Sequence, residues 1–301
     1  MGNFSRRLND VESFDHFFKA IKYSLDENLL GSFVDAELMT ITEHEQTSSS
    51  RRNRLPAYST DESRWQLRTK IVEELLNLER LVDDEKIKLG VGGAIPFGGA
   101  KSQKKAFIII GLPASGKSGI ANRIADEYSA IILDSDYAKR KLPEFDGFKS
   151  GASLVHAESG GIVFPGKMTI DQPFETLSEK VIKAGMNFVY PTVGQNYGSL
   201  IEYADSLKNS AGYEVHLILV NLDRQKATHR AIERYIKTNR YVPLGLIFDC
   251  YSNEPTLNYY YAKQRKSDLF ASFGEISTDV PYGDGPICDN LTDNSPVNLF
   301  L

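Results

Sequence analysis

The sequence contains the run Gly111-Leu112-Pro113-Ala114-Ser115-Gly116-Lys117-Ser118, which is its strongest indication of a fold class. It fits the pattern G-x-x-x-x-G-K-[ST], in which a glycine-rich loop cradles the phosphates of a nucleotide. The apolar, β-branched run at residues 106–110 leads into it and is typical of a buried strand. Residues 119–128 follow with Ile120 and Ile124 at helical spacing. A strand, a loop and a helix N-terminus in this order predict an anion site that binds ATP or GTP.

The polar groups of this loop have expected roles. Lys117 would reach the β- and γ-phosphates, and the Ser118 hydroxyl would ligate Mg²⁺. The alternative is a chance match to four constrained positions, which the flanking strand and helix argue against. ATP and Mg²⁺ are therefore the expected cofactors. The residues expected to contact the nucleotide are Gly111, Ala114, Ser115, Gly116, Lys117 and Ser118.

Composition limits the class of protein. The chain has 301 residues, of which 41% are hydrophobic and 25% charged, as in ordinary globular proteins. A net charge of −5 argues against a partner that is nucleic acid, whose phosphates need a basic face. No apolar run approaches the roughly 20 residues that span a bilayer, and residues 1–10 lack a signal-peptide core. With only Cys250 and Cys288, a cytoplasmic protein is expected, although secretion as a signal-less effector would leave no trace here.

Beyond residue 105, strand and helix patterns alternate, which indicates a parallel sheet. The predicted fold class is α/β, a P-loop NTPase-type parallel sheet flanked by helices, with an N-terminal helical segment. Strands are expected at residues 106–110, 130–133, 187–190 and 213–221. Helices are expected at residues 117–128, 174–184, 200–210 and 224–238. The tail after Thr278 is expected to be a loop with one edge strand.

Two helical stretches precede the loop. Asn9 and Glu12 form a candidate capping pair, and Ser59 and Glu62 suit a capping box for a second helix. The apolar positions of the first helix are Phe14, Phe17, Phe18, Ile21 and Leu25. Those of the second form one stripe of Leu67, Ile71, Leu75, Leu78 and Val82. The polar residues 43–54 are interpreted as a solvated loop, and the glycine-rich residues 90–100 as a flexible linker.

The second predicted strand carries the candidate reaction chemistry. It runs directly into Asp134-Ser135-Asp136. In open parallel sheets, ligands bind beyond the carboxyl ends of the strands. One carboxylate could accept the proton of an attacking hydroxyl, and the other could support Mg²⁺ or its waters. The alternative is an Asx turn that merely ends a strand.

Basic residues cluster near residue 235. A transferred phosphoryl group needs cations to balance its charge, and Arg230, Arg234, Lys237 and Arg240 lie on or just after the helix predicted at 224–238. A solvated basic face accounts for some of them. The guanine-recognition pattern Asn-Lys-x-Asp is missing from the sequence, so ATP is preferred over GTP.

Together these blocks resemble the zeta-toxin-type kinases. The resemblance covers Lys105 to Tyr282 and is weaker in the preceding segment, which starts at Tyr58. The matching runs are residues 111–118, the run Leu133-Asp134-Ser135-Asp136-Tyr137-Ala138-Lys139-Arg140-Lys141-Leu142-Pro143-Glu144-Phe145, the run Gly151-Ala152-Ser153-Leu154-Val155-His156-Ala157-Glu158-Ser159, Ile232-Glu233-Arg234-Tyr235 and Arg240-Tyr241-Val242-Pro243. A P-loop alone is shared by many families, whereas this ordered set is far more specific.

The resemblance implies a toxin kinase that moves the ATP γ-phosphate to a sugar hydroxyl of a nucleotide-linked metabolite. UDP-N-acetylglucosamine is the usual acceptor in the family, and some effector relatives phosphorylate the adenosine ribose of NAD. Asp136 would be the base, and Lys117, Arg234 and Arg240 would hold the triphosphate and the transition state. The residues assigned to substrate contacts by the same resemblance are Asp134, Lys139, His156, Glu158 and Thr192. His156 could equally be a core histidine.

The match departs from the family on the acceptor side. Where relatives tend to carry an acidic residue before Gly-Thr, this chain has Tyr190-Pro191-Thr192-Val193-Gly194. The paired acidic residues that follow the histidine in relatives appear here as His156-Ala157-Glu158. The ATP side is intact, so these departures bear on the identity of the acceptor.

The family comparison also suggests a domain organisation. Residues 1–90 would form a helical accessory segment and residues 91–301 the P-loop kinase domain. Zeta-type toxins are restrained by a helical antitoxin, so the segment could inhibit in cis, or it could pack as a structural part of the core. A separate antitoxin protein is the other expected partner. The rival functions are a polynucleotide or nucleoside kinase, and a nucleotide-dependent switch or binding module, which would need no acceptor base.

Overall fold

The computed structural model describes residues 6–40, 45–148, 151–166, 174–238, 240–281, 284–289 and 291–301. Tyr282, the predicted end of the family resemblance, lies outside the described residues, as do residues 43 and 44 of the predicted solvated loop.

The strands form one six-stranded sheet in the order β2-β3-β1-β4-β5-β6. β2 pairs with β3 and β4 with β5 in parallel, whereas β6 is antiparallel to β5. The predicted α/β class, a mostly parallel sheet with flanking helices, is therefore confirmed. The strands are β1 (Lys105–Ile110), β2 (Ile131–Ile132), β3 (Phe188–Thr192), β4 (Glu214–Asn221), β5 (Ser272–Ser277) and β6 (Ile287–Asp289).

The predicted helices after the P-loop are present. α4 (Lys117–Tyr128) and α11 (Arg224–Thr238) have the predicted bounds. α9 (Leu177–Lys183) is shorter than predicted, because Thr176 and Glu179 form a capping box that sets its first turn. α10 (Tyr197–Asp205) begins earlier than predicted, at an Asn196 cap, and continues as a π-helical turn over Ser206–Ser210.

Several elements were missed from the sequence. β5 was overlooked because Gly274 interrupts a short run, and glycine weakens a strand pattern. Its glycine has a packing reason, since a Cβ at Gly274 would lie 2.3 Å from Ser295 Oγ and 2.5 Å from Val297 Cγ2. The missed helices are α2 (Glu27–Leu38), α5 (Ser135–Lys141), α6 (Glu144–Gly147), α7 (Gly151–Leu154), α8 (His156–Val163) and α12 (Glu254–Arg265). The first predicted helix is also shorter than expected, because α1 (Val11–Ala20) ends before Leu25.

The chain divides into two compact units, each made of separate stretches of sequence. The first unit comprises Met1–Met39, Phe107–Ile120 and Thr192–Leu301, and the second comprises Thr40–Ala106 and Ala121–Pro191. This division differs from the predicted one at residue 90, because α1 (Val11–Ala20) and α2 (Glu27–Leu38) belong to the first unit and α3 (Asp61–Asn77) to the second.

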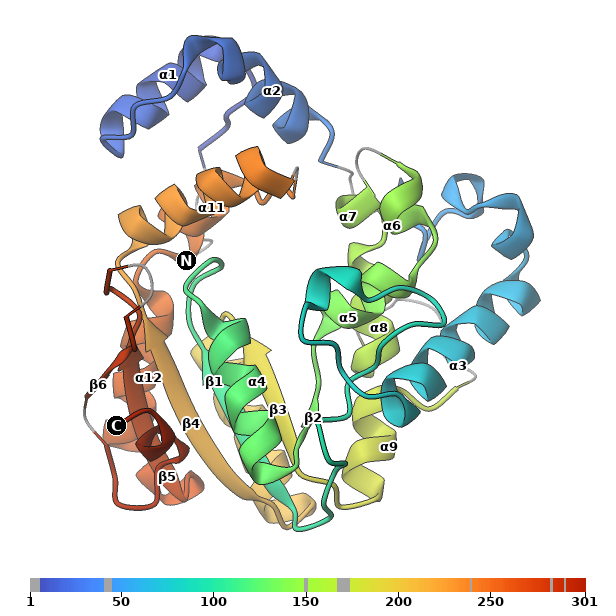
Figure 1. The fold of residues 1–301 in the computed structure, drawn as a ribbon, viewed down its shortest axis with the longest axis vertical. Helices are drawn as coiled ribbons and strands as arrows, with labels where there is room; N and C mark the ends of the chain where they lie inside the picture. Colours follow the sequence, from blue (N-terminus) through green and yellow to red (C-terminus); the bar gives the residue numbers. More distant parts are fainter. Residues whose placement is uncertain are drawn as a thin grey trace. The chain divides into compact units, whose positions relative to one another are not determined.

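In the first unit, α1 and α2 lie along α11 (Figure 1). Their aromatic side chains share one buried cluster with apolar residues of α11 and with Leu112 of the P-loop. The N-terminal cap of α1 is Asp10 with Ser13, so the predicted Asn9–Glu12 pair is wrong by one residue. The fully or almost fully buried members from the N-terminal segment are Leu8, Phe14, Phe17, Phe18, Ile21 and Phe33.

Hydrogen bonds also join α1 and α2 to α11. The carbonyl of Ile21, at the end of α1, accepts from Gln225 Nε2 at 2.7 Å and lies 2.8 Å from His229 Nε2. The Tyr235 hydroxyl donates to the Ser32 carbonyl of α2 at 2.8 Å. α1 and α2 are therefore anchored on α11 by both burial and specific polar contacts.

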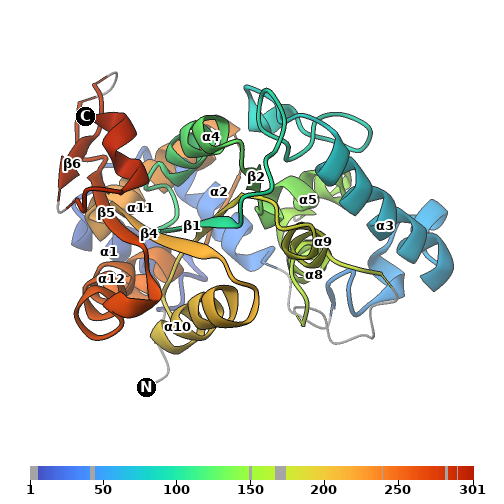
Figure 2. The ribbon, with the colours of Figure 1, turned by 90° about the horizontal axis from the view of Figure 1, so that it is seen from below.

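The remaining helices of this unit cover its strands. Figure 2 shows α10 and α12 on the same face of β4 and β5, and α12 packs on β4. The β4–β5 register pairs Val220 with Ile276, so both strands carry buried apolar residues close to their carboxyl ends.

In the second unit, α3 presents a buried face. Leu67, Ile71 and Leu75 are buried as predicted, but the cap is Thr60, which accepts from the Ser63 backbone N–H. The predicted Ser59–Glu62 capping box is therefore wrong by one residue. The helix ends at Asn77, and Val82 lies beyond it with 85% of its surface exposed, so it does not continue the stripe.

The segment after α3 is ordered, and its interpretation as a flexible linker is wrong. The Gly93 N–H donates to the Glu79 carbonyl at 2.8 Å, and the Ala94 N–H to the Leu75 carbonyl at 2.9 Å. The carbonyl of Ala94 in turn accepts from the N–H of Ile132 in β2. Backbone pairing therefore holds this glycine-rich stretch on α3 and on the edge of the sheet.

Among the residues that the structure describes, no helix is both long enough and apolar enough to cross a membrane.

Candidate active site

The P-loop of the first unit has the backbone that an anion site needs. It links β1 to α4, whose first residue is Lys117. Ala114 and Gly116 adopt left-handed conformations, with φ of 61° and 88°. A Cβ at Gly111 would lie 2.5 Å from the Val220 carbonyl oxygen, so only glycine fits where the loop leaves β1. The loop therefore has the backbone geometry that binds phosphate through its N–H groups.

Two polar side chains of the loop fit a nucleotide. Lys117 Nζ donates to the carbonyls of Gly111 and Leu112, both at 2.7 Å, so its ammonium group lies against the loop. Ser115 Oγ is buried and hydrogen-bonds to no other residue of the described chain. A buried hydroxyl without a partner is costly, and a bound phosphate would be one way to satisfy it. Ser118 is exposed on the first turn of α4.

The arginines of α11 divide by their contacts. Arg224 donates to the Phe248 carbonyl and to Ser252 Oγ, and its guanidinium stacks 4.4 Å from the Phe248 ring. Arg230 donates to Thr278, the residue after β5. Sequence reasoning missed Thr278, because an isolated threonine after an unpredicted strand gives no signal. Arg234 and Arg240 are half-buried.

In the second unit, α5 carries the two candidate carboxylates. Asp134 is its N-cap and accepts from the backbone N–H of Asp136 at 2.8 Å. The alternative interpretation, a polar turn that ends the strand, therefore applies to Asp134. Asp136 lies one turn before Lys139, whose Nζ is 2.7 Å from its Oδ1. The side chain of Asp136 is 41% exposed. Only Asp136 therefore presents its carboxylate on the open side of the helix.

Buried contacts explain why α5 has this orientation. The Tyr137 hydroxyl donates to Asp84 at 3.0 Å, and Arg140 pairs with Glu85 at 3.2 Å. Lys141 is fully buried, and its Nζ lies 2.7 Å from Glu74 of α3. Because three side chains of α5 point into the unit, the carboxylate of Asp136 remains toward solvent, with the mostly buried Lys139 beside it.

Burial and nearby charges shift the pKa values of Asp134 and His156. Desolvation, and then the charge of Asp136, raise the pKa of Asp134. Desolvation, and then the charge of Lys139, lower the pKa of His156, against the opposing effect of Asp136. α5, which carries Asp136 and Lys139, packs on α8, which begins at His156. Since His156 is exposed at the start of α8, the interpretation as a core histidine is wrong.

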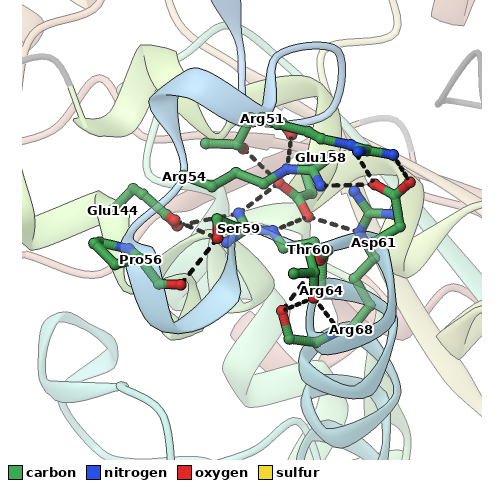
Figure 3. A network of polar contacts seen from close by, with 12 residues as sticks. Arg51, Arg54, Pro56, Ser59, Thr60, Asp61, Arg64, Arg68, Glu144 and Glu158 are labelled. Carbon is green, nitrogen blue, oxygen red and sulfur yellow. Dashed lines mark hydrogen bonds and ion pairs between the residues drawn. The ribbon is translucent and has the colours of Figure 1, made fainter.

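Glu158, predicted to contact substrate, lies instead in a buried ion cluster (Figure 3). Arg64 of α3 pairs with Glu158 at 2.6 Å and with Glu144 at 2.8 Å, and all three side chains are fully buried. Arg68 adds a contact of 2.7 Å to Glu158, and Thr47 donates to the same carboxylate. Its carboxylate is occupied by the protein, so we do not keep Glu158 among the proposed substrate contacts.

The same cluster corrects the prediction for residues 43–54. Thr47 and Arg54 are buried, and Arg54 Nε donates to the Thr47 carbonyl at 2.8 Å. Arg54 also pairs with Asp61 at 3.1 Å. The described part of this polar segment is therefore integral to the second unit and not a solvated loop.

The predicted site residues divide between the units. The P-loop, Arg234, Arg240 and the half-buried Thr192 at the end of β3 belong to the first unit. Asp134, Asp136, Lys139, His156 and Glu158 belong to the second. Within the described ranges, no group of three or more His, Cys, Asp or Glu side chains is arranged to hold a metal ion.

The fold and the site residues define a P-loop phosphotransferase. The zeta toxin family model matches residues 96–256, which is more than half of the chain. The protein belongs to the zeta toxin family, and its predicted kinase activity is confirmed at the level of a phosphotransferase.

One solved structure shows the same fold at low sequence identity, and a second is a weaker match. A chain of the PezAT toxin-antitoxin system of Streptococcus pneumoniae has a TM-score of 0.54 and 15% identity, over 82% of this chain and 89% of that one. A chain of the AvrRxo1-ORF1:-ORF2 complex has a TM-score of 0.46 and 15% identity, over 84% of this chain and 74% of that one. No curated protein sequence matches the chain significantly.

We predict opposite effects of Ser115→Ala with and without nucleotide. Removing a buried hydroxyl that has no partner should raise the free energy of unfolding by about 1 kcal/mol. ATP with Mg²⁺ should then raise the melting temperature less than in the unaltered protein, because one phosphate contact is gone. Thermal melts with and without nucleotide measure both effects. Ser118→Ala, at an exposed position, is the comparison. It should reduce only the part of the rise in melting temperature that depends on Mg²⁺. A loss of stability in nucleotide-free Ser115→Ala would contradict the assignment.

The buried cluster predicts an acid-sensitive second unit. Burial opposes ionisation of Glu158, but the hydrogen bonds and charges of Arg64 and Arg68 outweigh it and lower its pKa from 4.5 to about 2. Because the folded value is the lower one, the stabilisation is complete above pH 4.5 and is lost as the pH falls toward 2. Its size is about 3 kcal/mol.

Chemical denaturation of Glu158→Gln between pH 6 and pH 2 tests this. The variant should lose stability at neutral pH and show a flatter decline in acid. Glu73→Gln, at an exposed position of α3, is the matched control and should keep the slope of the unaltered protein. Identical slopes for the two variants would show that Glu158 does not carry this pH dependence.

Proposed function

We propose that the protein is an ATP-dependent kinase that phosphorylates a sugar hydroxyl of a nucleotide-linked metabolite, and that it acts as a toxin. The observation that carries the proposal is the Asp136 carboxylate, which is 41% exposed and lies 2.7 Å from Lys139 Nζ. A switch or binding module transfers no phosphate to an acceptor, so it would not need a solvent-exposed carboxylate as a base. The acceptor hydroxyl needs such a base, since the transfer itself needs little other covalent chemistry from the protein.

On the donor side, the loop N–H groups and the start of α4 would bind the triphosphate. Lys117 would exchange its loop carbonyls for the β- and γ-phosphates, and Arg234 and Arg240 would neutralise charge that develops during transfer. Ser118 would ligate Mg²⁺, which supplies charge neutralisation between the phosphates. These assignments follow the family resemblance residue by residue.

On the acceptor side, Asp136 would take the proton of the attacking hydroxyl. Lys139 pairs with this carboxylate at 2.7 Å and fixes its position. Lys139 and His156 also place cationic or hydrogen-bonding groups beside the base, which suits an acceptor that carries phosphate. UDP-N-acetylglucosamine is the first choice on the family resemblance, and the adenosine ribose of NAD is the second. Both acceptors contain a diphosphate, so charge alone does not separate them.

A panel of acceptors with matched variants tests the function. The protein is incubated with ATP, Mg²⁺ and UDP-N-acetylglucosamine, NAD, nucleosides or an oligonucleotide, and products are detected by mass spectrometry as a gain of one phosphate. Asp136→Asn should lower the rate by about 10²- to 10⁴-fold, the usual contribution of a general base. Asp146→Asn, at an exposed position of the same unit, is the control. Full activity of Asp136→Asn would refute the base assignment, and retained activity of Lys117→Ala would refute the ATP site.

The relative from Streptococcus pneumoniae is described as part of a toxin-antitoxin system. We therefore propose that an antitoxin restrains this protein too, either as a separate chain or in cis through α1 and α2. The packing of these helices on α11 and on Leu112 of the P-loop supports the cis alternative. It also supports a purely structural role, because the same contacts bury a large apolar cluster.

Removing residues 1–90 does not separate the two roles. Such a chain would lack Arg64 and Arg68, and Glu144 and Glu158 would be left as buried charges without partners. Breaking a buried pair in this way costs about 3–5 kcal/mol. Loss of activity would then report unfolding and not regulation.

A single hydroxyl offers a cleaner test of inhibition in cis. Tyr235→Phe removes the 2.8 Å hydrogen bond to Ser32 of α2 but keeps the ring in the apolar cluster. The loss of about 1 kcal/mol should make a shifted packing of these helices several-fold more populated and tighten ATP binding to a similar extent. Calorimetric titration measures the affinity, with Tyr197→Phe in α10 as the control. Unchanged affinity in Tyr235→Phe would argue for a structural role alone.

A further inference from the structure

Thr278 contacts both the P-loop and α11. Its Oγ1 donates to the Ser115 carbonyl at 2.8 Å and accepts from Arg230 Nη1 at 3.2 Å. Its carbonyl accepts from Arg230 Nη2 at 2.7 Å. Because Arg230 donates to one side of the hydroxyl, the proton of Thr278 is directed to the loop carbonyl. The three residues thus form a bridge from α11 to the loop.

The bridge fixes the direction of one loop peptide. A trans peptide is planar, so its C=O and N–H groups point in opposite directions. When Thr278 holds the Ser115 carbonyl, the N–H of Gly116 must face the other way, away from Thr278. The Cγ2 of Thr278 lies 3.4 Å from the place that a Cβ of Gly116 would occupy, so the side chain also covers this peptide.

Thr278 is itself well anchored. Its N–H donates to the Asn221 carbonyl at the end of β4, at 3.3 Å. The side chain of Asn221 donates to Glu275 of β5 at 2.8 Å, and Tyr260 of α12 donates to the same carboxylate at 2.6 Å. A threonine held by two strands and a helix can impose an orientation on the loop.

We infer that Thr278 is a positioning residue for ATP, which turns the Ser115–Gly116 peptide so that the Gly116 N–H faces the phosphates. Arg230 orients the hydroxyl that does so and thereby couples α11, the helix that carries Arg234, to the loop. The inference rests on the proposed function only in taking ATP as the ligand of the P-loop. It does not depend on the acceptor.

The experiment compares two substitutions that differ by one hydroxyl. Thr278→Val keeps the shape of the side chain but cannot bond the Ser115 carbonyl, whereas Thr278→Ser keeps the bond. Binding of a non-hydrolysable ATP analogue with Mg²⁺ is measured by calorimetry, beside the melting temperature of each nucleotide-free variant. Thr278→Val should weaken binding about five- to tenfold, the effect of losing one hydrogen bond of about 1 kcal/mol or slightly more. Thr278→Ser should restore it.

Two variants of α11 complete the test. Arg230→Met should weaken binding in the same direction, because the Thr278 hydroxyl is then free to rotate. Lys226→Met is the matched control. Lys226 lies one turn before Arg230 on α11, and it pairs at 2.7 Å with Asp279, the residue that follows Thr278. It should bind the analogue as the unaltered protein does.

The outcomes separate this inference from the proposed function. Equal binding by Thr278→Val and the unaltered protein would overturn it, and so would equal losses in Thr278→Val and Thr278→Ser. If the unaltered protein binds the analogue but phosphorylates no acceptor, the proposed function fails and the binding series still decides the role of Thr278. If the unaltered protein binds no analogue, both fail.

Discussion

The second unit depends on a guanidinium group that water does not reach. Arg64 lies between Glu144 and Glu158, and the three charged side chains are fully buried. Such a cluster contributes little net stability compared with apolar packing, but no single member can be removed without leaving an unpaired buried charge. It therefore requires α3 to be present wherever α6 and α8 are folded. α3 is for this reason an integral part of the second unit.

The first unit also depends on helices that precede the P-loop, but there the contacts are apolar. Phe14, Phe17 and Phe33 have no exposed surface, and their cluster includes Leu112 of the P-loop. A helix pair that only blocked a site would be expected to present a detachable, partly polar face. Here the aromatic side chains continue the packing of α11. Any regulation by α1 and α2 must therefore act through small shifts of a packed interface and not through release of a separate domain.

The sequence predicted best where local pattern and tertiary role coincide. The P-loop, α4 and α11 were predictable because a loop motif and helical spacing directly encode them. Capping pairs were misplaced by one residue, since Asp10 and Thr60 stand beside equally suitable capping residues. Glu158 and Thr47 could not be assigned to a buried cluster, because their partner Arg64 is 94 residues from Glu158 in the chain. Thr278 escaped notice for the same reason, as its contacts are made only after β5 joins β4.

These corrections narrow where acceptor specificity can reside. The chain lacks the acidic residue that relatives tend to carry near Thr192, and Glu158 is turned inward to pair with Arg64 and Arg68. Within the second unit, the carboxylate of Glu158 is thus turned away from any acceptor, while Lys139 remains paired with Asp136. A less acidic surface disfavours neutral polyols, which bind through carboxylate hydrogen bonds, relative to ligands with phosphate. We therefore propose that the acceptor of this protein carries phosphate and is not an uncharged sugar.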